Sequence, residues 1–187
     1  IEIVFFMAGG SGPWIAGDIE ELYSAGVQKV IIFGNCGVLD SKIEDCSIII
    51  PTKGFRDEGT SYHYVSPSET IEINPDYKED FIKILNEYNF DYTEGYTWTI
   101  DAFYRETKDK IKYFKDNGAV CVEMEGTVIA SVCQRLNMKY FTFYYAGDNL
   151  DSTVWDKRSI DGPTNIDKKK EVLLIALELA VVLNNYE

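Results

Sequence analysis

The segment IEIVFFMAGGSGPWIAGDIEELYSAGVQKVIIFGNCG, residues 1–37, indicates the class of fold. A continuous apolar run at 1–7 predicts a strand, and the glycine-rich stretch 8–13 predicts the loop that follows it. Apolar residues then recur at helical spacing over 14–26, and a second apolar strand is expected at 30–33. Because both strands are apolar on both faces, this β-α-β arrangement predicts an α/β protein whose sheet is covered on each side.

The remaining elements follow from periodicity and from turn residues. Asn74 and Pro75 are typical of a helix N-cap and first helical residue, and Gly118 is typical of a helix end. The other predicted elements are strands at 47–51, 92–99 and 140–146 and helices at 108–117, 126–136 and 168–184. Since no repeat or linker interrupts them, residues 1–187 are expected to form a single domain.

Composition narrows the classes of function. With 187 residues, of which 45% are hydrophobic, the chain is long enough for one sizeable core. The formal net charge of -13 argues against binding to nucleic acid, because affinity for phosphates depends on clustered Lys and Arg. A small-molecule site with a few local cations remains open.

The cysteines suggest neither a disulfide framework nor a zinc site. Cys36, Cys46, Cys121 and Cys133 form no C-x-x-C pair, and His63 is the only histidine, so no metal is expected. Reduced thiols in a cytoplasmic protein are the simplest interpretation. No apolar run approaches the ~20 residues that span a bilayer, so no association with a membrane is expected.

Two carboxylates flank Met124 at the point where the apolar run 119–122 meets the predicted helix 126–136. Burying an unpaired carboxylate costs about several kcal/mol, so Glu123 and Glu125 each need a compensating donor. The helix N-terminus offers amide donors to one of them. Adjacent ligand hydroxyls could donate to the other, and a ribose 2′,3′-diol fits best. The alternative is a pair of glutamates that cap a solvated turn.

Five segments are candidates for a ligand site, because ligands of open α/β sheets bind at the carboxyl ends of strands. They are 34–37, 56–64, 99–107, 123–126 and 147–150. Four motifs cover most of them: Arg-Asp-Glu-Gly-Thr-Ser-Tyr-His-Tyr at 56–64, Trp-Thr-Ile-Asp-Ala-Phe-Tyr-Arg-Glu-Thr at 98–107, Val-Glu-Met-Glu-Gly at 122–126 and Gly-Asp-Asn-Leu at 147–150. In this order and spacing they resemble the purine nucleoside phosphorylase and uridine phosphorylase superfamily, over nearly the whole chain.

The resemblance implies an α/β fold, a three-layer sandwich around a central mixed, partly barrel-like β-sheet. It also implies a homo-oligomer, a dimer, trimer or hexamer, with the site near a subunit interface. The expected partners are a nucleoside and phosphate; phosphate is a co-substrate, and no metal or organic cofactor is needed. Relative to the family, the chain that begins at Ile1 is expected to lack an N-terminal strand and its Gly-rich phosphate loop.

The resemblance assigns the sugar site to the Val-Glu-Met-Glu-Gly motif. Glu125 would accept hydrogen bonds from the ribose hydroxyls and serve catalysis, while Met124 would pack on the sugar. Glu123 is assigned to substrate binding beside them. The alternative for Met124 is a side chain that fills a gap in the core.

The resemblance assigns the base site to the motifs at 98–107 and 147–150. Phe103 would stack on the base, because an aromatic face accepts any nucleobase; the alternative is a core aromatic. Asp148 matches the acid that protonates the purine N7 as the glycosidic bond breaks, which requires a raised pKa. Its alternative is a loop cap. Asn149, next to it, is assigned to substrate binding.

The phosphate site departs from the family. Gly34 and Asn35 begin a short loop whose amides could approach an oxyanion. However, Ile32 stands where the purine-specific branch has a phosphate-binding Arg, and Asn35 stands where it has a hydroxyl residue. Arg56 is the candidate replacement cation, and pairing with a neighbouring carboxylate is its alternative. His63, between two tyrosines, is interpreted as a packed or surface residue.

The sequence therefore predicts phosphorolysis of a nucleoside to free base and ribose 1-phosphate. Asp148 favours a purine, whereas the motif at 56–64 is more similar to uridine phosphorylases. Residues 103–109 contain no Gln and Arg pair of the kind that reads uracil. The alternatives are a uridine phosphorylase, a nucleosidase that uses water, and a catalytically silent homologue that binds nucleosides.

Overall fold

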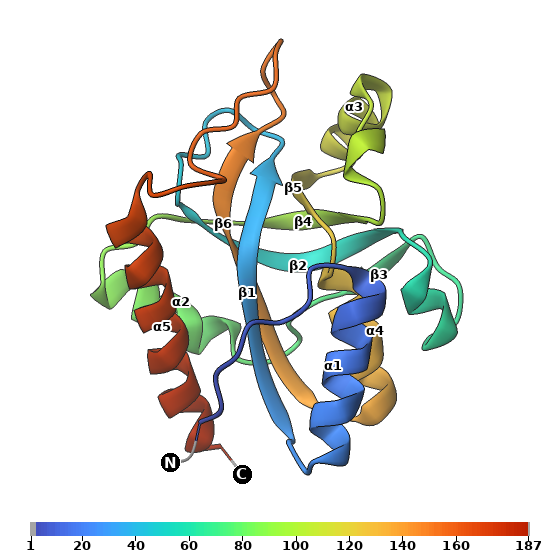
Figure 1. Cartoon of the computed structure of the whole chain (residues 1–187), viewed down its shortest axis with the longest axis vertical. Coiled ribbons are helices and arrows are strands. Elements are labelled where there is room, and N and C mark those ends of the chain that lie inside the picture. Colours follow the sequence, from blue (N-terminus) through green and yellow to red (C-terminus); the bar gives the residue numbers. More distant parts are fainter. Residues whose placement is uncertain (1–2, 187) are drawn as a thin grey trace.

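The computed structural model describes residues 3–186, and its six strands form one mixed sheet (Figure 1). The strands are β1 (Lys29–Val38), β2 (Ile48–Asp57), β3 (Thr70–Glu72), β4 (Tyr92–Ile100), β5 (Ala119–Glu123) and β6 (Lys139–Asn149). Their order is β3-β2-β4-β5-β1-β6, and β2 also pairs with β6. This last pairing closes β2, β4, β5, β1 and β6 into a barrel, which confirms the mixed, barrel-like sheet that the resemblance implied.

The pairing register shows how the barrel closes. β1 and β6 run parallel over ten residue pairs, and β2 runs parallel to β4 over nine. The closing contact is short and antiparallel: Ile48 pairs with Tyr145, and Ile49 pairs with Tyr144. β3 extends the same edge of β2 farther along, at Lys53–Phe55. One barrel therefore brings the ends of β1, β5 and β6 together.

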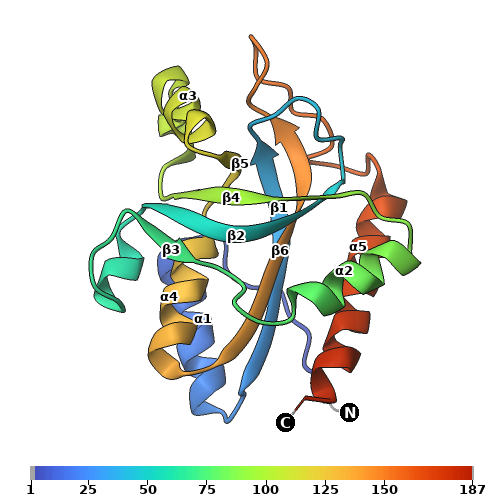
Figure 2. The ribbon, with the colours of Figure 1, turned by 180° about the vertical axis from the view of Figure 1, so that it is seen from behind.

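Helices cover the barrel on two sides (Figure 2). They are α1 (Gly12–Ser24), α2 (Lys78–Glu87), α3 (Lys108–Asp116), α4 (Gly126–Leu136) and α5 (Ile166–Asn184), with 3₁₀ turns η1 (Thr60–His63) and η2 (Phe103–Arg105). α1 packs on α4 and α2 packs on α5, which gives the three layers. Ile15, Ile19 and Val128 belong to one interlayer core, and Phe81, Phe141 and Leu179 belong to the other. The apolar residues at helical spacing in the sequence are thus the ones that form the buried faces of these helices.

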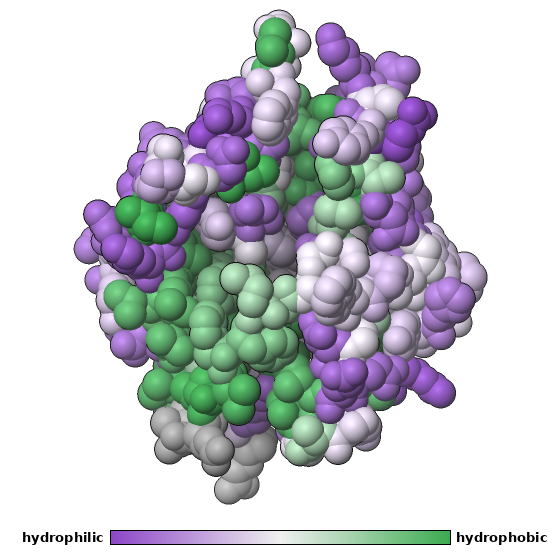
Figure 3. Space-filling model, viewed as in Figure 1, coloured by the Kyte–Doolittle hydropathy of each residue, from purple (hydrophilic) through white to green (hydrophobic). Residues whose placement is uncertain are grey.

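The predicted strand at 1–7 is wrong where the structure describes it. Residues 3–9 have no regular secondary structure and cross the face of β1 between α1 and α5 (Figure 1). Their side chains form much of an apolar surface there (Figure 3): Met7 is 94% exposed and Val4 is 71% exposed. An apolar run becomes a strand only when a neighbouring strand accepts its backbone hydrogen bonds. Residues 1–2 lie outside the described residues.

The predicted start of the second helix is also wrong. α2 begins at Lys78, because Asn74 has another role. Its buried amide donates to the carbonyls of Pro51 and Thr142 and accepts from the Thr142 amide. Asn74 therefore joins β2 to β6 with a left-handed backbone, at φ 54°.

Two predicted loops lie inside strands. Residues 34–37 belong to β1, where they pair with β6 and β5, and residues 147–149 belong to β6. The glycines in these stretches led to their interpretation as loops. Instead, the long parallel pairing of β1 with β6 continues through both of them. The four cysteines are free, in agreement with the interpretation as reduced thiols, and all four are buried. No helix within residues 3–186 is long and apolar enough to cross a membrane.

Candidate functional site

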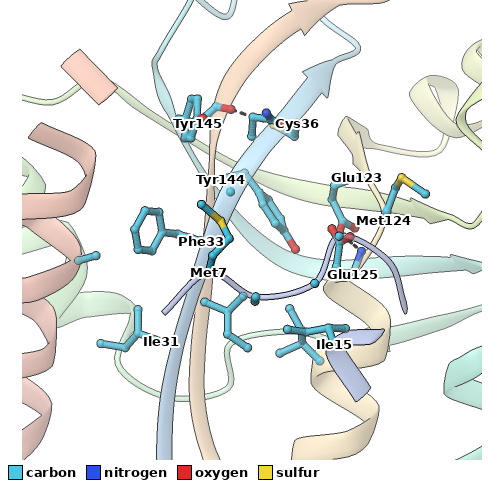
Figure 4. Close-up of a pocket in the computed structure, with 18 of the residues that line it drawn as sticks. Met7, Ile15, Ile31, Phe33, Cys36, Glu123, Met124, Glu125, Tyr144 and Tyr145 are labelled. Atoms are coloured by element: carbon cyan, nitrogen blue, oxygen red, sulfur yellow. Dashed lines mark hydrogen bonds between the residues drawn. The ribbon is translucent and has the colours of Figure 1, made fainter. Parts of the chain in front are cut away.

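The candidate site is one end of a cavity of about 1560 Å³ that extends along the face of β1. Several predicted site residues line it: Gly34, Asn35, Phe103, Glu123, Met124, Glu125 and Asp148. Figure 4 shows the two glutamates beside Met124 at the end of β5, across from Tyr144 of β6. Arg56 and Asn149 are not among the lining residues. The barrel therefore brings the sugar and base candidates together, but not all the phosphate candidates.

Glu123 is the carboxylate that the helix end compensates. One oxygen accepts from the Glu125 and Gly126 amides at 2.7 and 2.6 Å, and the other accepts from two hydroxyls of β4. These hydroxyls belong to Thr97, at 3.0 Å, and Thr99, at 2.5 Å. Burial raises the pKa of Glu123, and the four donors oppose that rise. Both oxygens of the Glu123 carboxylate are thus hydrogen-bonded to groups of the protein itself.

Glu125 is the carboxylate without such partners. It is the N-cap residue of α4, but its side chain makes no capping hydrogen bond. Burial raises the pKa of Glu125 to about 8, the nearby charge of Glu123 adds to the rise, and the Met124 amide opposes it. A half-buried carboxylate on a cavity wall, beside a second negative charge, is suited to accept hydrogen bonds from a ligand. Of the two glutamates, Glu123 is thus the one that binds the amides at the start of α4. The expected role of Glu125 in holding a ribose stays a prediction.

Asp148 lies near the end of β6 and is 7% exposed. Trp155 donates its indole N–H to the carboxylate at 2.6 Å. Burial raises the pKa of Asp148, whereas the hydrogen bond from Trp155 lowers it. Gly37 on β1 makes room, because a Cβ there would lie 3.0 Å from the Asp148 carboxylate and 2.3 Å from Leu150. An acid whose pKa is raised by burial therefore faces the cavity, held by the hydrogen bond from Trp155.

Phe103 and Glu106 also line the cavity, at the start of η2 and just after its end. Phe103 is 52% exposed and its ring lies 4.3 Å from that of Tyr104, so it is not a core aromatic. Burial raises the pKa of Glu106 to about 7, and the charge of Asp148 adds to the rise. Glu106 stands inside the motif at 98–107, yet the sequence analysis gave it no role. Only the fold brings it near Asp148.

Arg56 does not reach the cavity. It is 6% exposed, and its guanidinium donates to Ser61 and Ser68 hydroxyls and to the Ser66 carbonyl. The Tyr62 ring lies 4.0 Å from the guanidinium carbon. This network holds η1 in place. The expectation that Arg56 could replace the missing phosphate cation is therefore not supported by its position.

Asn149 is occupied by the loop that follows β6. Its side chain donates to Ser41 and accepts from the Asp151 amide. Its backbone pairs with Asp156 in both directions, at 2.8 and 3.2 Å. This bridge folds the loop back and places Trp155 on Asp148. Asn149 thus affects the site through the loop and is not a lining residue. The sequence analysis gave no indication of the role of Trp155.

Cations are scarce in this cavity. Of the side chains of residues 3–186 that line it, only Lys29 and Lys108 are cationic. Lys29 donates to the Leu183 carbonyl at the end of α5, away from the glutamates. His63 is exposed on η1 and does not line the cavity. Within the described part of the chain, no group of three or more His, Cys, Asp or Glu side chains is arranged to hold a metal ion.

The closed mixed barrel between two helical layers, with carboxylates at a strand-to-helix turn, is the arrangement that the resemblance to nucleoside phosphorylases implied. Residues 18–181 match the model of the phosphorylase superfamily, and the chain belongs to this superfamily. The resemblance inferred from the four motifs is thereby confirmed. The chain spans about half the length of curated relatives that it matches, 53% in the case of a guanosine phosphorylase.

Relatives include enzymes of two reaction types. The chain is 24% identical over 127 residues, 68% of its length, to the guanosine phosphorylase of Halorubrum lacusprofundi. It is 31% identical over 173 residues, 84% of its length and 73% of the relative, to the 5′-methylthioadenosine/S-adenosylhomocysteine nucleosidase of Buchnera aphidicola. The solved AMP nucleosidase of Bacteroides thetaiotaomicron has a TM-score of 0.76 over 94% of this chain and 69% of that chain. At 16% identity, this last likeness is one of fold.

Proposed function

We propose that this chain binds a nucleoside and cleaves its N-glycosidic bond. The observation that supports it is the contrast between two adjacent carboxylates: Glu123 has four donors from the fold, while Glu125 faces the cavity with none from a side chain. A vicinal diol supplies two donors at the spacing of one carboxylate. In this proposal Glu125 holds the ribose, Met124 packs on the sugar, and Phe103 stacks on the base.

The base leaves with help from Asp148. Bond cleavage puts positive charge on the sugar and negative charge on the leaving base. A carboxylic acid whose pKa is raised by burial can donate a proton to the N7 of a purine as that charge develops. The Trp155 indole orients the carboxylate by binding one of its oxygens. A purine nucleoside is therefore the proposed substrate, and neither a metal nor an organic cofactor has a step.

Phosphate is the proposed nucleophile, and water is the second candidate. The guanosine phosphorylase relative supports phosphate, whereas the nucleosidase relative supports water. Two structural observations favour water. The amides of residues 34–37 lie within the paired strand β1, and no arginine of residues 3–186 lines the cavity. Of the two lysines that line the cavity, Lys29 donates to the Leu183 carbonyl, so Lys108 is the remaining cation of the described lining for a phosphate dianion.

Product analysis tests the proposal. The protein is incubated with guanosine, adenosine or uridine, with and without inorganic phosphate, and base and sugar products are separated. Release of a purine base that depends on phosphate and yields ribose 1-phosphate is expected. Release indifferent to phosphate, with free ribose, would select water. Preference for uridine would overturn the purine assignment, and nucleoside binding without any release would indicate a silent homologue.

We also propose a homo-oligomer, as the resemblance implies. Residues 3–7 expose five consecutive apolar side chains, from 41% for Ile3 to 94% for Met7, on an apolar face of the molecule (Figure 3). Contiguous exposed apolar side chains of this kind are typical of an interface between subunits. Light scattering of the purified chain at micromolar concentration should give a mass that is a multiple of 21.3 kDa. A monomeric mass throughout the concentration range would contradict it.

A further inference from the structure

The hydroxyl of Tyr144 is a buried polar group without a partner. Tyr144 is 3% exposed, and its phenolic oxygen has no hydrogen bond within residues 3–186. Buried hydroxyls are nearly always paired, so an exception points to a function or to a missing partner. Thr142, two residues earlier on the same face of β6, has the other unpartnered hydroxyl nearby. It helps to lower the pKa of Tyr144, against a larger rise caused by burial, but forms no hydrogen bond of normal geometry with it.

The Tyr144 hydroxyl lies at the start of α4, beside the two glutamates. A Cβ on Gly126 would lie 2.5 Å from the Tyr144 oxygen and 2.9 Å from an oxygen of Glu123. Glycine at 126 therefore leaves the space that the hydroxyl occupies. Figure 4 shows the ring reaching from β6 with its hydroxyl pointing toward Glu123 and Glu125. Tyr144 also lines the cavity, so the hydroxyl stands between the barrel interior and the site.

Only one of the two carboxylates has capacity for this donor. Glu123 already accepts four hydrogen bonds, while no side chain of residues 3–186 donates to Glu125, which also forms no capping bond. We propose that Tyr144 is a positioning residue whose hydroxyl donates to the Glu125 carboxylate when a nucleoside is bound, and so holds it in the orientation that accepts the ribose hydroxyls. The inference rests on the proposed function and adds a residue to it.

The surroundings explain why such a donor is needed. The ionisable groups that face Tyr144 are Glu123 and Cys121 of β5 and Glu125 of α4, and all are acids. The charge of Glu123 opposes ionisation of Glu125. A hydrogen bond from a phenol favours the ionised carboxylate without adding a counter-charge. The Tyr144 hydroxyl is thus the uncharged donor available among these acids.

The test compares Tyr144→Phe with the matched control Thr142→Val. Each removes one unpartnered buried hydroxyl, and only the first lies on the cavity. If Tyr144 acts through Glu125, Tyr144→Phe lowers nucleoside affinity and kcat/KM by roughly 10- to 100-fold, the range for one hydrogen bond to a charged group. Its melting temperature should be unchanged or higher, because no native hydrogen bond is lost. Because the Thr142 side chain interacts with the Tyr144 hydroxyl but does not line the cavity, Thr142→Val should lower kcat/KM far less than Tyr144→Phe and leave stability near wild type.

A double-mutant cycle with Glu125→Gln supplies the second readout. Calorimetric titration with guanosine should show that Tyr144→Phe costs nothing further once Glu125 is an amide, since the donor then has no charged acceptor. Additive losses, a lowered melting temperature for Tyr144→Phe, or a Tyr144→Phe variant equal to wild type would each overturn the inference alone. A wild-type protein that neither binds a nucleoside nor releases a base would overturn the proposed function, and this inference with it.

Discussion

At the scale of single residues, the Glu125 carboxylate destabilises the fold when it is ionised, but it is available to bind a ligand. Burial raises its pKa to about 8, far above the usual value of 4.5. The folded state therefore binds this proton more tightly than the unfolded state, so the stability from the group is full below pH 4.5 and is lost as the pH rises through 8. A carboxylate kept at such a site is typical of a binding residue.

Glu125→Gln should consequently reduce turnover by about 100-fold or more while it keeps the fold, because it removes charge and keeps volume. Its melting temperature should be equal to wild type near pH 5 and higher near pH 9, with an effect of about 1–3 kcal/mol after allowance for penetrating water. Thermal melts at several pH values, with turnover measured beside them, check both parts. Wild-type turnover in the variant would refute the assignment.

Asp148 permits a test of base chemistry at the same scale. Asp148→Asn cannot donate a proton to the purine N7, so nucleosides with poor leaving groups should lose nearly all turnover. Nucleosides with activated bases, such as 7-methylguanosine, need no such proton and should retain most of it. Initial rates on the two substrate types give the comparison. Equal losses on both would mean that Asp148 positions the base and does not protonate it.

At the scale of elements, the turn from β5 to α4 depends on Glu123. Its carboxylate joins the first amides of α4 to the hydroxyls of Thr97 and Thr99 on β4. Glu123→Gln replaces one acceptor oxygen with a donor, and buried donors then lose their acceptor at a cost of about 1–3 kcal/mol. Chemical denaturation should show this loss for Glu123→Gln and not for Glu125→Gln. The same loss in both variants would mean that the two carboxylates share one structural role.

At the scale of the whole molecule, excess negative charge opposes compactness. The sequence has 31 acidic and 18 basic residues, and the ion pairs among the described residues are mostly on the surface, as with Lys112 and Asp116. Such pairs contribute little, whereas self-repulsion acts over the whole surface. Raising NaCl from about 10 to about 300 mM, which shortens the Debye length several-fold, should therefore raise the melting temperature by a few degrees. KCl should act equally, and a fall would mean that ion pairs dominate.

Much of the architecture could be read from the chain because it depends on local pattern. The helix 126–136 and the strand at 92–99 were predicted nearly residue for residue, since apolar spacing is enough to define a buried face. The charge of -13 and the four unpaired cysteines likewise follow from composition. The resemblance of four short motifs, taken in order, pointed to the superfamily that the family model confirms. Each of these motifs lies where a strand ends.

Contacts between distant segments could not be read in this way. The apolar run at 3–7 has strand-like composition but no partner strand, and Asn74 looks like a helix cap but bridges β2 and β6. Arg56 pairs with the serines around η1, and Trp155 reaches Asp148 only because Asn149 folds a loop back. Which of two neighbouring glutamates the fold satisfies, and which remains open to a ligand, depends on β4 hydroxyls more than twenty residues away. Local periodicity predicts which residues are buried. A hydrogen-bond partner across the barrel, however, is in place only once the barrel has closed.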